Sequence, residues 1–468
     1  MGAACCAGAA VAGAGAAAGP SSFLDGTIYS FLSAIPIALY HYYPHITLIL
    51  TTLLVLGASS LYLLLILLTP ETKTSSPSEL TFLSTSSKDP QPLPSLLDEL
   101  EEGGLNGAAQ LSVVVPAYNE KERLPVMLKE TVEFLDALKT QKKSLVQGIQ
   151  QSNGKPNSTP TQANGSATTT AVHAALRQPL TSYEIIIVDD GSKDGTHQVA
   201  LDFAQSHSSP NIRVVRLVKN RGKGGAVRHG VLHSRGHLIL FADADGATSF
   251  NDLSNLCRVL SNVVTRTGHG VAVGSRAHMV KSNAVVKRSF VRNFLMHCFH
   301  LFLTLLLRPP TLGSLLRRWR AKRAKSGRGG EGREKLPVQP EIKDTQCGFK
   351  LFTRPTAKVV FPASHIDGWI FDVELLILAQ TSSTIALQQQ QPSICKDKQE
   401  DEEGEEEGEW GALKKLPVPI AEVSVHWQEV GGSKIDLVRD SIRMALDLIV
   451  IRANYKLGRW KMPGAATR

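Results

Sequence analysis

Short apolar runs recur between residues 111 and 241 and alternate with stretches of helical periodicity. Each run is almost continuously apolar and rich in β-branched residues, which is typical of a strand that is buried on both faces. Strands that alternate with helices in this way predict an α/β fold, with a mostly parallel sheet and helices on both of its faces. The runs are LSVVV (111–115), EIIIV (184–188), RVVRLV (213–218) and HLILF (237–241).

A different apolar pattern lies near the N-terminus. Residues 26–70 contain no Lys, Arg, Asp or Glu, and within them residues 46–68 form a leucine-rich run. A helix of this length can cross a hydrocarbon layer of about 30 Å, since each residue adds about 1.5 Å. A cleaved signal peptide would instead need a basic start, a shorter apolar core and an earlier position. We therefore expect an uncleaved transmembrane anchor over residues 45–69.

The charges on either side of this anchor predict its orientation. No Lys or Arg precedes it, whereas Lys73 and a basic remainder follow it. Because positive charge is enriched on cytosolic segments, we expect a single-pass protein whose main domain faces the cytosol. Residues 27–43 are also fairly apolar, and the sequence leaves open whether they enter the membrane.

Changes in composition divide the remaining chain. Three polar or charge-rich segments interrupt the regular rhythm and are expected to be disordered insertions. The expected parts are a low-complexity segment (1–44), the anchor (45–69), a Ser/Thr/Pro-rich linker (70–110), the α/β domain (111–455) with insertions at about 141–180, 309–340 and 384–413, and a C-terminal tail (456–468).

Overall charge and cysteine content exclude some classes of function. The formal net charge of +9 would suit a nucleic-acid partner. No nucleic-acid-binding motif accompanies the basic segments, so we expect no such partner. The six cysteines form no CxxC pair. This fits a reduced, cytosol-facing protein better than a disulfide framework or a zinc site.

A polar motif follows each of the four predicted strands. The motifs are PAYNE (116–120), DDGS (189–192), NRGKGG (220–225) and DAD (243–245). Ligands of an open parallel sheet collect at the carboxyl ends of its strands, so we expect these motifs to share one site. A single motif such as DDGS could also be only a turn followed by a helix cap.

The last motif has the chemistry of a cation site. Asp243 and Asp245 would repel each other and resist burial unless a cation neutralised them. Oxygen ligands select Mg²⁺ or Mn²⁺ over zinc, and such an ion typically bridges substrate phosphates. An exposed turn is the simpler alternative. The phosphate loop of P-loop NTPases is absent, which excludes that class of chemistry.

These motifs resemble a known family. VVVPAYNE, VDDGSKDGT, NRGKGGAVRHG and FADADGATSF are similar to the family 2 glycosyltransferases, which have the GT-A (Rossmann-like) fold. VGSRAH (273–278), DTQCGFKLF (344–352), WIFDVELL (369–376) and PVPIAEVSVHWQEVGGSK (417–434) more narrowly resemble the eukaryotic dolichyl-phosphate β-glucosyltransferases. The resemblance covers about residues 111–455 apart from the insertions.

The resemblance implies transfer of glucose from UDP-glucose to dolichyl phosphate, with inversion, at the endoplasmic reticulum membrane for protein N-glycosylation. A dolichyl-phosphate mannose synthase using GDP-mannose, or a non-catalytic, membrane-anchored nucleotide-sugar binder, remains the alternative. By motif, the uridine would be held by Pro116, Tyr118, Glu120 and Asp190 with Asp189 beside them. Asp243 would face the ribose and the diphosphate, and Lys223 would also belong to the donor-binding residues. Asp245 would be the main metal ligand, and Arg276 with Arg288 would receive the acceptor phosphate.

The acceptor decides whether a catalytic base is needed. A phosphate monoester has a second pKa of about 6, so at neutral pH it is already an anionic nucleophile. Asp372 and Glu374 lie where other family members carry a base. We expect these two residues to position the sugar or basic side chains instead.

A lipid acceptor also requires contact with the membrane surface. Residues 293–307 are apolar but too short to span, which predicts an interfacial helix, and the basic stretch 308–335 follows them. A buried helix followed by a solvated loop remains the alternative. Residues 435–455, with Arg439, Arg443 and Arg452 among apolar positions, predict a second amphipathic helix.

Overall fold

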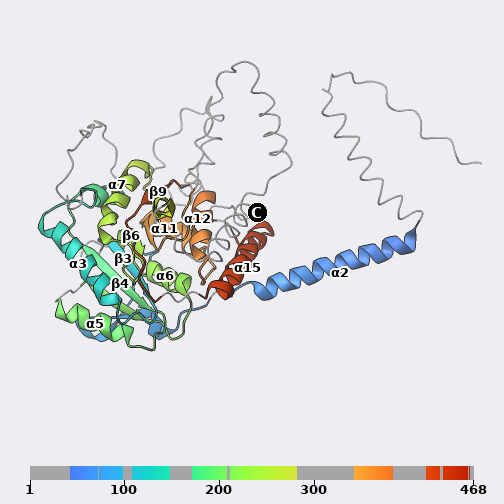
Figure 1. The fold of residues 1–468 in the computed structure, drawn as a ribbon, viewed down its shortest axis with the longest axis horizontal. Helices are drawn as coiled ribbons and strands as arrows, with labels where there is room; N and C mark the ends of the chain where they lie inside the picture. The colour runs from blue at the N-terminus through green and yellow to red at the C-terminus, as the bar shows by residue number, and fades with distance from the viewer. Residues whose placement is uncertain are drawn as a thin grey trace, which may run out of the picture. The chain divides into compact units, whose positions relative to one another are not determined.

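The computed structural model describes residues 43–71, 73–98, 108–147, 171–207, 211–281, 342–382, 418–432, 436–461 and 463 (Figure 1). The chain divides into two compact units, Met1–Thr69 and Pro70–Arg468. Several predictions lie outside the described residues, and the structure does not test them. They are the low-complexity segment up to residue 42, the interfacial helix at 293–307, the insertions at 309–340 and 384–413, and the position of Arg288.

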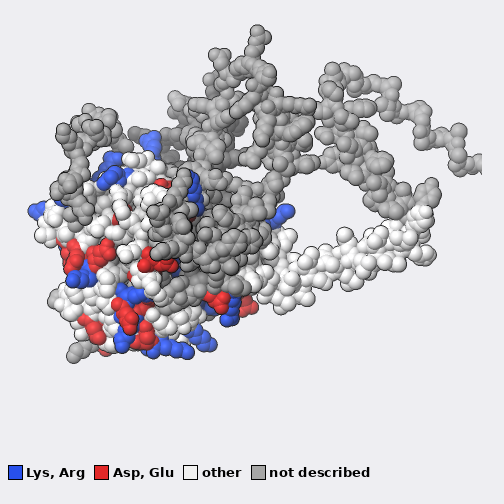
Figure 2. Space-filling view, viewed as in Figure 1, with Lys and Arg blue, Asp and Glu red and all other residues white. Residues whose placement is uncertain are grey.

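The first unit contains one described helix, α2 (Pro44–Leu68). Its proline occupies the start of the helix, where a backbone N–H would have no partner in any case. Almost all of its apolar side chains are exposed to solvent, and Figure 2 shows no charged side chain along it. Within the described residues, α2 alone is long and apolar enough to cross a membrane. The helix expected over residues 45–69 is therefore confirmed, as a candidate membrane span.

The second unit is built on a mixed sheet whose strand order is β2-β1-β5-β4-β3-β6-β8-β7-β9. The central strands β5, β4, β3 and β6 pair in parallel, as β7 and β9 do. Strand β8 runs antiparallel between β6 and β7. The bounds are β1 (Thr81–Ser84), β2 (Ser87–Pro92), β3 (Ala109–Ala117), β4 (Tyr183–Asp189), β5 (Ile212–Arg216), β6 (Gly236–Ala242), β7 (Val271–Ser275), β8 (Phe349–Thr353) and β9 (Ile420–Ser424).

The four predicted strands are confirmed as the parallel centre of this sheet. They correspond to β3, β4, β5 and β6, and every residue of β4 is buried. Burial on both faces explains why these runs are apolar throughout instead of alternating. Strands β7, β8 and β9 were not predicted. Each is a run of only five residues within a motif that also contains polar residues.

Helices cover both faces of the sheet, as predicted. Leu111 and Val113 on one face of β3 belong to the core that also contains side chains of α3, α4, α5 and α7. On the other face, α6 packs so closely that a Cβ at Gly230 would overlap Val114. Figure 1 shows α3 and α6 on opposite sides of β3 and β4. The helices are α3 (Leu124–Thr140), α4 (Ala171–Arg177), α5 (Thr196–Ser206), α6 (Lys223–Leu232), α7 (Leu253–Val263), α11 (Arg354–Val360), α12 (Phe371–Thr381) and α15 (Leu437–Lys456), with short 3₁₀ turns η1 (Pro77–Leu80), η2 (Phe250–Asp252) and η3 (Ala277–Lys281).

The linker expected over residues 70–110 is wrong for much of its length. Strands β1 and β2 lie within it and extend the sheet beyond β5. Two apolar side chains, Phe82 and Leu96, are buried against the rest of the unit, and Arg213 lies 4.4 Å above the Phe82 ring. This segment is therefore a structured edge of the sheet. Its polar composition did not indicate this, because only a few of its side chains are buried.

Two other predicted boundaries also need correction. The ends of the insertion expected at 141–180 belong to the core, because Leu145, Val172, Leu176 and Leu180 are buried. The segment from 148 to 170 lies outside the described residues. Near the other end of the chain, Trp460 in the expected tail (456–468) is buried and stacks on His365 at 4.1 Å between ring centroids.

A buried carboxylate joins the N-terminal edge to the centre of the unit. Glu79 accepts hydrogen bonds from the backbone N–H groups of Ser76 (2.7 Å) and Val218 (2.9 Å), and it pairs with Arg221. Burial raises the pKa of Glu79, but the two N–H donors and Arg221 lower it more, so the net shift is downward. The folded protein therefore favours the ionised form of Glu79.

We predict that Glu79→Gln lowers the free energy of unfolding by about 3 kcal/mol at pH 7, because an amide cannot satisfy three donors around a buried carboxylate. Since the pKa of Glu79 is depressed in the folded state, its contribution is full above the unfolded value of about 4.3 and is lost as the pH falls through the folded value. Urea titrations in detergent at pH 7 and pH 3 measure both effects.

The matched control is Glu133→Gln, which removes a carboxylate from an exposed pair with Lys129 at 3.9 Å. Exposed pairs contribute little, so this change should leave stability within about 0.5 kcal/mol of the wild type. Equal effects of the two substitutions would contradict the structural role of Glu79.

Candidate active site

Contacts between successive motifs bring the four predicted motifs together at one edge of the sheet. The backbone N–H of Asn119 in the first motif donates to Ser192 Oγ in the second at 2.9 Å. The carboxylate of Asp190 accepts two backbone N–H groups from the third motif. Lys223 Nζ in the third motif lies 2.6 Å from Asp243 Oδ1 in the fourth. Their expected convergence at the carboxyl ends of the strands is therefore confirmed.

The first motif ends β3 and turns sharply away from the sheet. Pro116 is buried within the strand, Tyr118 is half-buried, and Asn119 has a positive φ of 52°. Glu120 is buried and accepts hydrogen bonds from Arg123 at 2.6 and 2.7 Å. The three predicted uridine-holding residues of this motif, Pro116, Tyr118 and Glu120, thus lie at the end of β3 and in the turn after it, and the Glu120 carboxylate is paired with Arg123.

The two aspartates of the second motif have different partners. Asp189 Oδ1 accepts the N–H of Ser192 at 2.9 Å, and its other oxygen lies 3.3 Å from His197 Nδ1. Asp190 accepts the N–H groups of Arg221 (2.7 Å) and Gly222 (2.9 Å). Burial raises the pKa of Asp190 to about 7, although these N–H donors oppose the shift. Asp190 therefore fixes the turn that leads into α6.

Negative charge accumulates where β6 ends. Burial and the neighbouring charge of Asp243 both raise the pKa of Asp245, which makes its ionised form less favourable than in water. Lys223 provides a positive charge beside Asp243. Burial lowers the pKa of Lys223, but Asp243 and Asp372 raise it more, and the net shift is upward. One lysine therefore partly neutralises a group of carboxylates.

This carboxylate pair fits a hard divalent cation. Asp243 and Asp245 present only oxygen donors, and their mutual repulsion is the condition that a bound cation relieves. No group of three or more His, Cys, Asp or Glu side chains suited to a metal occurs among the described residues. An ion held here would thus need further ligands from substrate or water, as Mg²⁺ and Mn²⁺ commonly do.

Arg276, the residue predicted to receive the acceptor phosphate, follows β7. Its Nε and Nη2 donate to the two carboxylate oxygens of Asp344 at 2.7 and 3.0 Å. Burial lowers the pKa of Arg276, but Asp344 raises it more strongly, and Asp243 contributes in the same direction. Asp344 lies in the noted DTQCGFKLF motif, yet the sequence assigned it no role because its partner is distant along the chain.

A second buried pair, Lys350 and Asp372, interacts with Lys223 of the site. Lys350 Nζ lies 2.6 Å from Asp372 Oδ1 and also donates to the main-chain oxygen of Cys347. Burial raises the pKa of Asp372, although Lys350 and Lys223 oppose this. Asp372 thus positions basic side chains, as we expected. A lysine within the apolar strand FKLFT was the only sequence signal for Lys350.

Glu374 has no accessible acceptor position in this arrangement. It is fully buried and accepts the backbone N–H groups of His365 and Ile366, both at 2.8 Å. Tyr455 Oη donates to it at 3.0 Å, and His365 Nδ1 lies 3.2 Å away. These contacts give Glu374 a structural role in joining α12 to α15.

Comparisons with known proteins agree with this architecture. Residues 159–297 match the profile of glycosyl transferase family 2. The chain is 38% identical to the dolichyl-phosphate β-glucosyltransferase of Dictyostelium discoideum, over 75% of this chain and 76% of that protein. The human protein of that name is 35% identical, over 75% and 78% of the two chains. The Saccharomyces cerevisiae protein of that name is 34% identical, over 88% and 94%.

Among solved structures, a glucosyl-3-phosphoglycerate synthase from Mycobacterium tuberculosis aligns with 74% of this chain and 80% of its own, at 16% identity and a TM-score of 0.33. The family membership rests on the sequence relatives, whose identity and coverage extend over most of both chains. This chain is a glycosyltransferase with a GT-A-like fold, and it belongs to the dolichyl-phosphate β-glucosyltransferase family.

Proposed function

We propose that this chain transfers glucose from UDP-glucose to dolichyl phosphate, with inversion at the sugar, at the cytosolic face of the endoplasmic reticulum membrane, for protein N-glycosylation. The observation that carries the proposal is the arrangement of charge at the end of β6. Asp243 and Asp245 are suited to a cation, and the cations Lys223 and Arg276 are close enough to interact with Asp243. Such a site can bind a sugar diphosphate and a second phosphate together.

The donor side would use the first two motifs and Lys223. Asp190 and the turn around Tyr118 would hold the uridine, with Asp189 fixing the loop through Ser192. Lys223 would contact the diphosphate, since its Nζ already lies beside Asp243. A Mg²⁺ or Mn²⁺ ion held by Asp245 and Asp243 would stabilise negative charge that develops on the leaving diphosphate.

The acceptor side would use Arg276. Asp344 engages its Nε and Nη2, so the guanidinium is held in one orientation. No hydrogen bond from Nη1 to any described residue is present, and this group would donate to an oxygen of the acceptor phosphate. An arginine that is paired with a carboxylate can still bind phosphate, because the guanidinium is planar and has five N–H donors.

The reaction needs no catalytic base from this chain. The bond between the sugar and the leaving diphosphate breaks as an acceptor phosphate oxygen forms its bond on the opposite face, which inverts the sugar carbon. A phosphate monoester with a second pKa of about 6 brings its own negative charge and no proton to remove. Internal partners of Asp372 and Glu374 agree with this view, because neither carboxylate is available to accept a proton.

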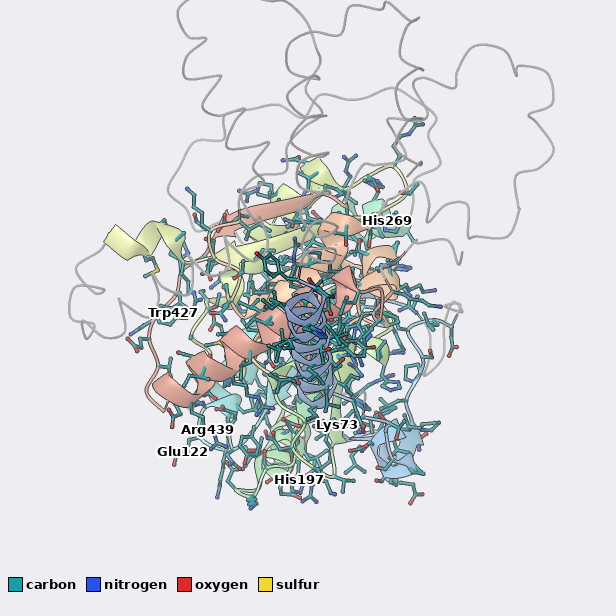
Figure 3. The ribbon with its side chains drawn as sticks, turned by 90° about the vertical axis from the view of Figure 1, so that its right-hand side faces the viewer. Lys73, Glu122, His197, His269, Trp427 and Arg439 are labelled. Atoms are coloured by element: carbon teal, nitrogen blue, oxygen red, sulfur yellow. The ribbon has the colours of Figure 1, made fainter. Side chains whose placement is uncertain are left out.

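Two features favour a membrane-embedded acceptor. Helix α2 is apolar, uncharged and exposed, which suits a span of the bilayer. Helix α15 exposes Ile442, Leu446 and Ile449, a spacing that places them on one face of the helix. Arg439, labelled in Figure 3, is exposed near the start of α15. An apolar stripe with adjacent arginine is typical of a helix that lies on an anionic membrane surface.

Membranes that contain the protein should form a labelled lipid from UDP-glucose and dolichyl phosphate, but not from GDP-mannose or UDP-N-acetylglucosamine. Asp245→Asn should reduce this synthesis by on the order of 10²–10³-fold, because a group that stabilises the leaving diphosphate is lost. The control Asp202→Asn, on the exposed side of α5, should retain full activity. Labelled lipid from GDP-mannose instead would contradict the proposed donor.

Gly348 provides a second test, because a Cβ at this position would overlap the carboxylate of Asp243. Gly348→Ala should displace that carboxylate and weaken UDP-glucose binding about tenfold or more, while lowering the free energy of unfolding by about 1–3 kcal/mol. Isothermal titration and thermal unfolding measure the two effects. Gly431→Ala is the matched control, since nothing lies within 4 Å of its added Cβ. Unchanged donor affinity in Gly348→Ala would show that Asp243 does not serve the donor.

A further inference from the structure

A small cavity lies beside the outer face of α6, away from the carboxylates at the end of β6. Its volume is about 90 Å³, several times what one water molecule needs. Gly225 and Arg228 of α6 line it together with Lys73 and Arg221. Lys223 does not line it, and is directed at Asp243 instead. The cavity therefore lies apart from the Asp243–Asp245 pair, although two of its lining residues, Lys73 and Arg221, also interact with Asp190.

Positive charge exceeds negative charge around this cavity. Lys73, Arg221 and Arg228 line it, and Asp367 is the one carboxylate among its lining residues. Arg221 is also paired with Glu79, which does not line the cavity. The three positive charges of the lining therefore face two negative charges, those of Asp367 and Glu79. His229 also lines the cavity, but burial lowers its pKa to about 4, and it is neutral at pH 7.

Arg228 and Lys73 each have N–H donors for which the described residues show no hydrogen bond. Arg228 Nη1 donates to the main-chain oxygen of Ser364 at 2.9 Å and lies 3.7 Å from Asp367. No other hydrogen bond from its guanidinium to a described residue is present. Among the described residues, Lys73 Nζ forms one ion pair, with Asp367 at 3.8 Å, and it also interacts electrostatically with Asp190; more than half of its side chain is exposed. Lys73, labelled in Figure 3, therefore lies at an accessible rim, with Arg228 deeper inside.

We propose that this cavity binds a phosphate group through Lys73 and Arg228. A tetrahedral anion of a few heavy atoms matches its size, and the spare N–H donors match phosphate oxygens. The sequence position of Lys73 adds a constraint on the source of that group. Only a few residues separate Lys73 from Leu68 at the end of α2, and an extended chain gains at most about 3.6 Å per residue. If α2 spans a bilayer, Lys73 stays within reach of lipid headgroups.

The proposed occupant would contact the turn that leads into the donor site. The main-chain oxygen of Asp367 accepts the N–H of Gly225 at 3.2 Å, and a Cβ at Gly222 would come within 2.6 Å of the same oxygen. The N–H groups of Arg221 and Gly222 hold Asp190 on the other side of this turn. The phosphate group would thus lie on one side of the turn and the donor-binding carboxylate on the other.

The test is binding of radiolabelled inorganic phosphate to the full-length protein in detergent, with saturating UDP and Mg²⁺ present to fill the donor site. Every protein compared, the wild-type reference included, carries Arg276→Gln, so that the proposed acceptor-phosphate position does not contribute. We expect saturable binding that Arg228→Gln and Lys73→Gln each weaken about tenfold, because each loses a charge-assisted contact. The matched control Lys139→Gln, on the exposed end of α3, should bind as the wild type does. Arg228→Lys should retain part of the affinity, since it keeps the charge.

A second arm identifies the source of the phosphate group. The protein is reconstituted in phosphatidylcholine vesicles with or without phosphatidic acid, and phosphate binding is repeated. Loss of phosphate binding with phosphatidic acid identifies a lipid headgroup as the occupant, whereas unchanged binding identifies the free ion. Absence of saturable binding, or equal binding by wild type, Arg228→Gln and Lys73→Gln, would overturn the proposal. Because no sugar transfer is measured, this result is independent of the proposed enzymatic function.

Discussion

Repulsion between carboxylates at the end of β6 is the constraint on which the candidate active site depends. Asp243 and Asp245 directly follow a buried strand and are themselves only partly exposed, so their charges are less well solvated than they would be on an open surface. Lys223 supplies part of the compensation at 2.6 Å from Asp243. Additional positive charge from a divalent cation would remove the remaining repulsion. Under the proposed function, this site would bind a cation together with a phosphate-bearing substrate.

Supporting residues keep these charges in place. Lys350 and Asp372 form a buried pair, and Asp372 also interacts with Lys223 of the site. Asp344 holds Arg276 through two hydrogen bonds, so its guanidinium keeps one orientation. The contacts of these carboxylates give them roles in holding cations, and a role as catalytic base is not required of them. A phosphate acceptor, which needs no base, is therefore the substrate class that this arrangement suits best.

The centre of the fold was predictable from the sequence because burial on both faces leaves a continuous apolar run. The same reasoning located the four polar motifs, since parallel strands end at one edge of the sheet. The N-terminal edge was not predictable, because only Phe82 and Leu96 anchor a segment of polar composition. Neither was the role of Asp344 or Lys350, whose partners Arg276 and Asp372 become neighbours only after folding. Trp460 was missed for the same reason.

The most direct test of the account is a titration of Mn²⁺ into the purified protein with UDP present, followed by electron paramagnetic resonance. If Asp245 and Asp243 hold the cation, the wild type should bind one Mn²⁺, and Asp245→Asn should weaken its affinity on the order of tenfold to a hundredfold. Asp243→Asn should have an effect in the same direction. Wild-type Mn²⁺ affinity in both variants would contradict the central claim that these two carboxylates form the cation site.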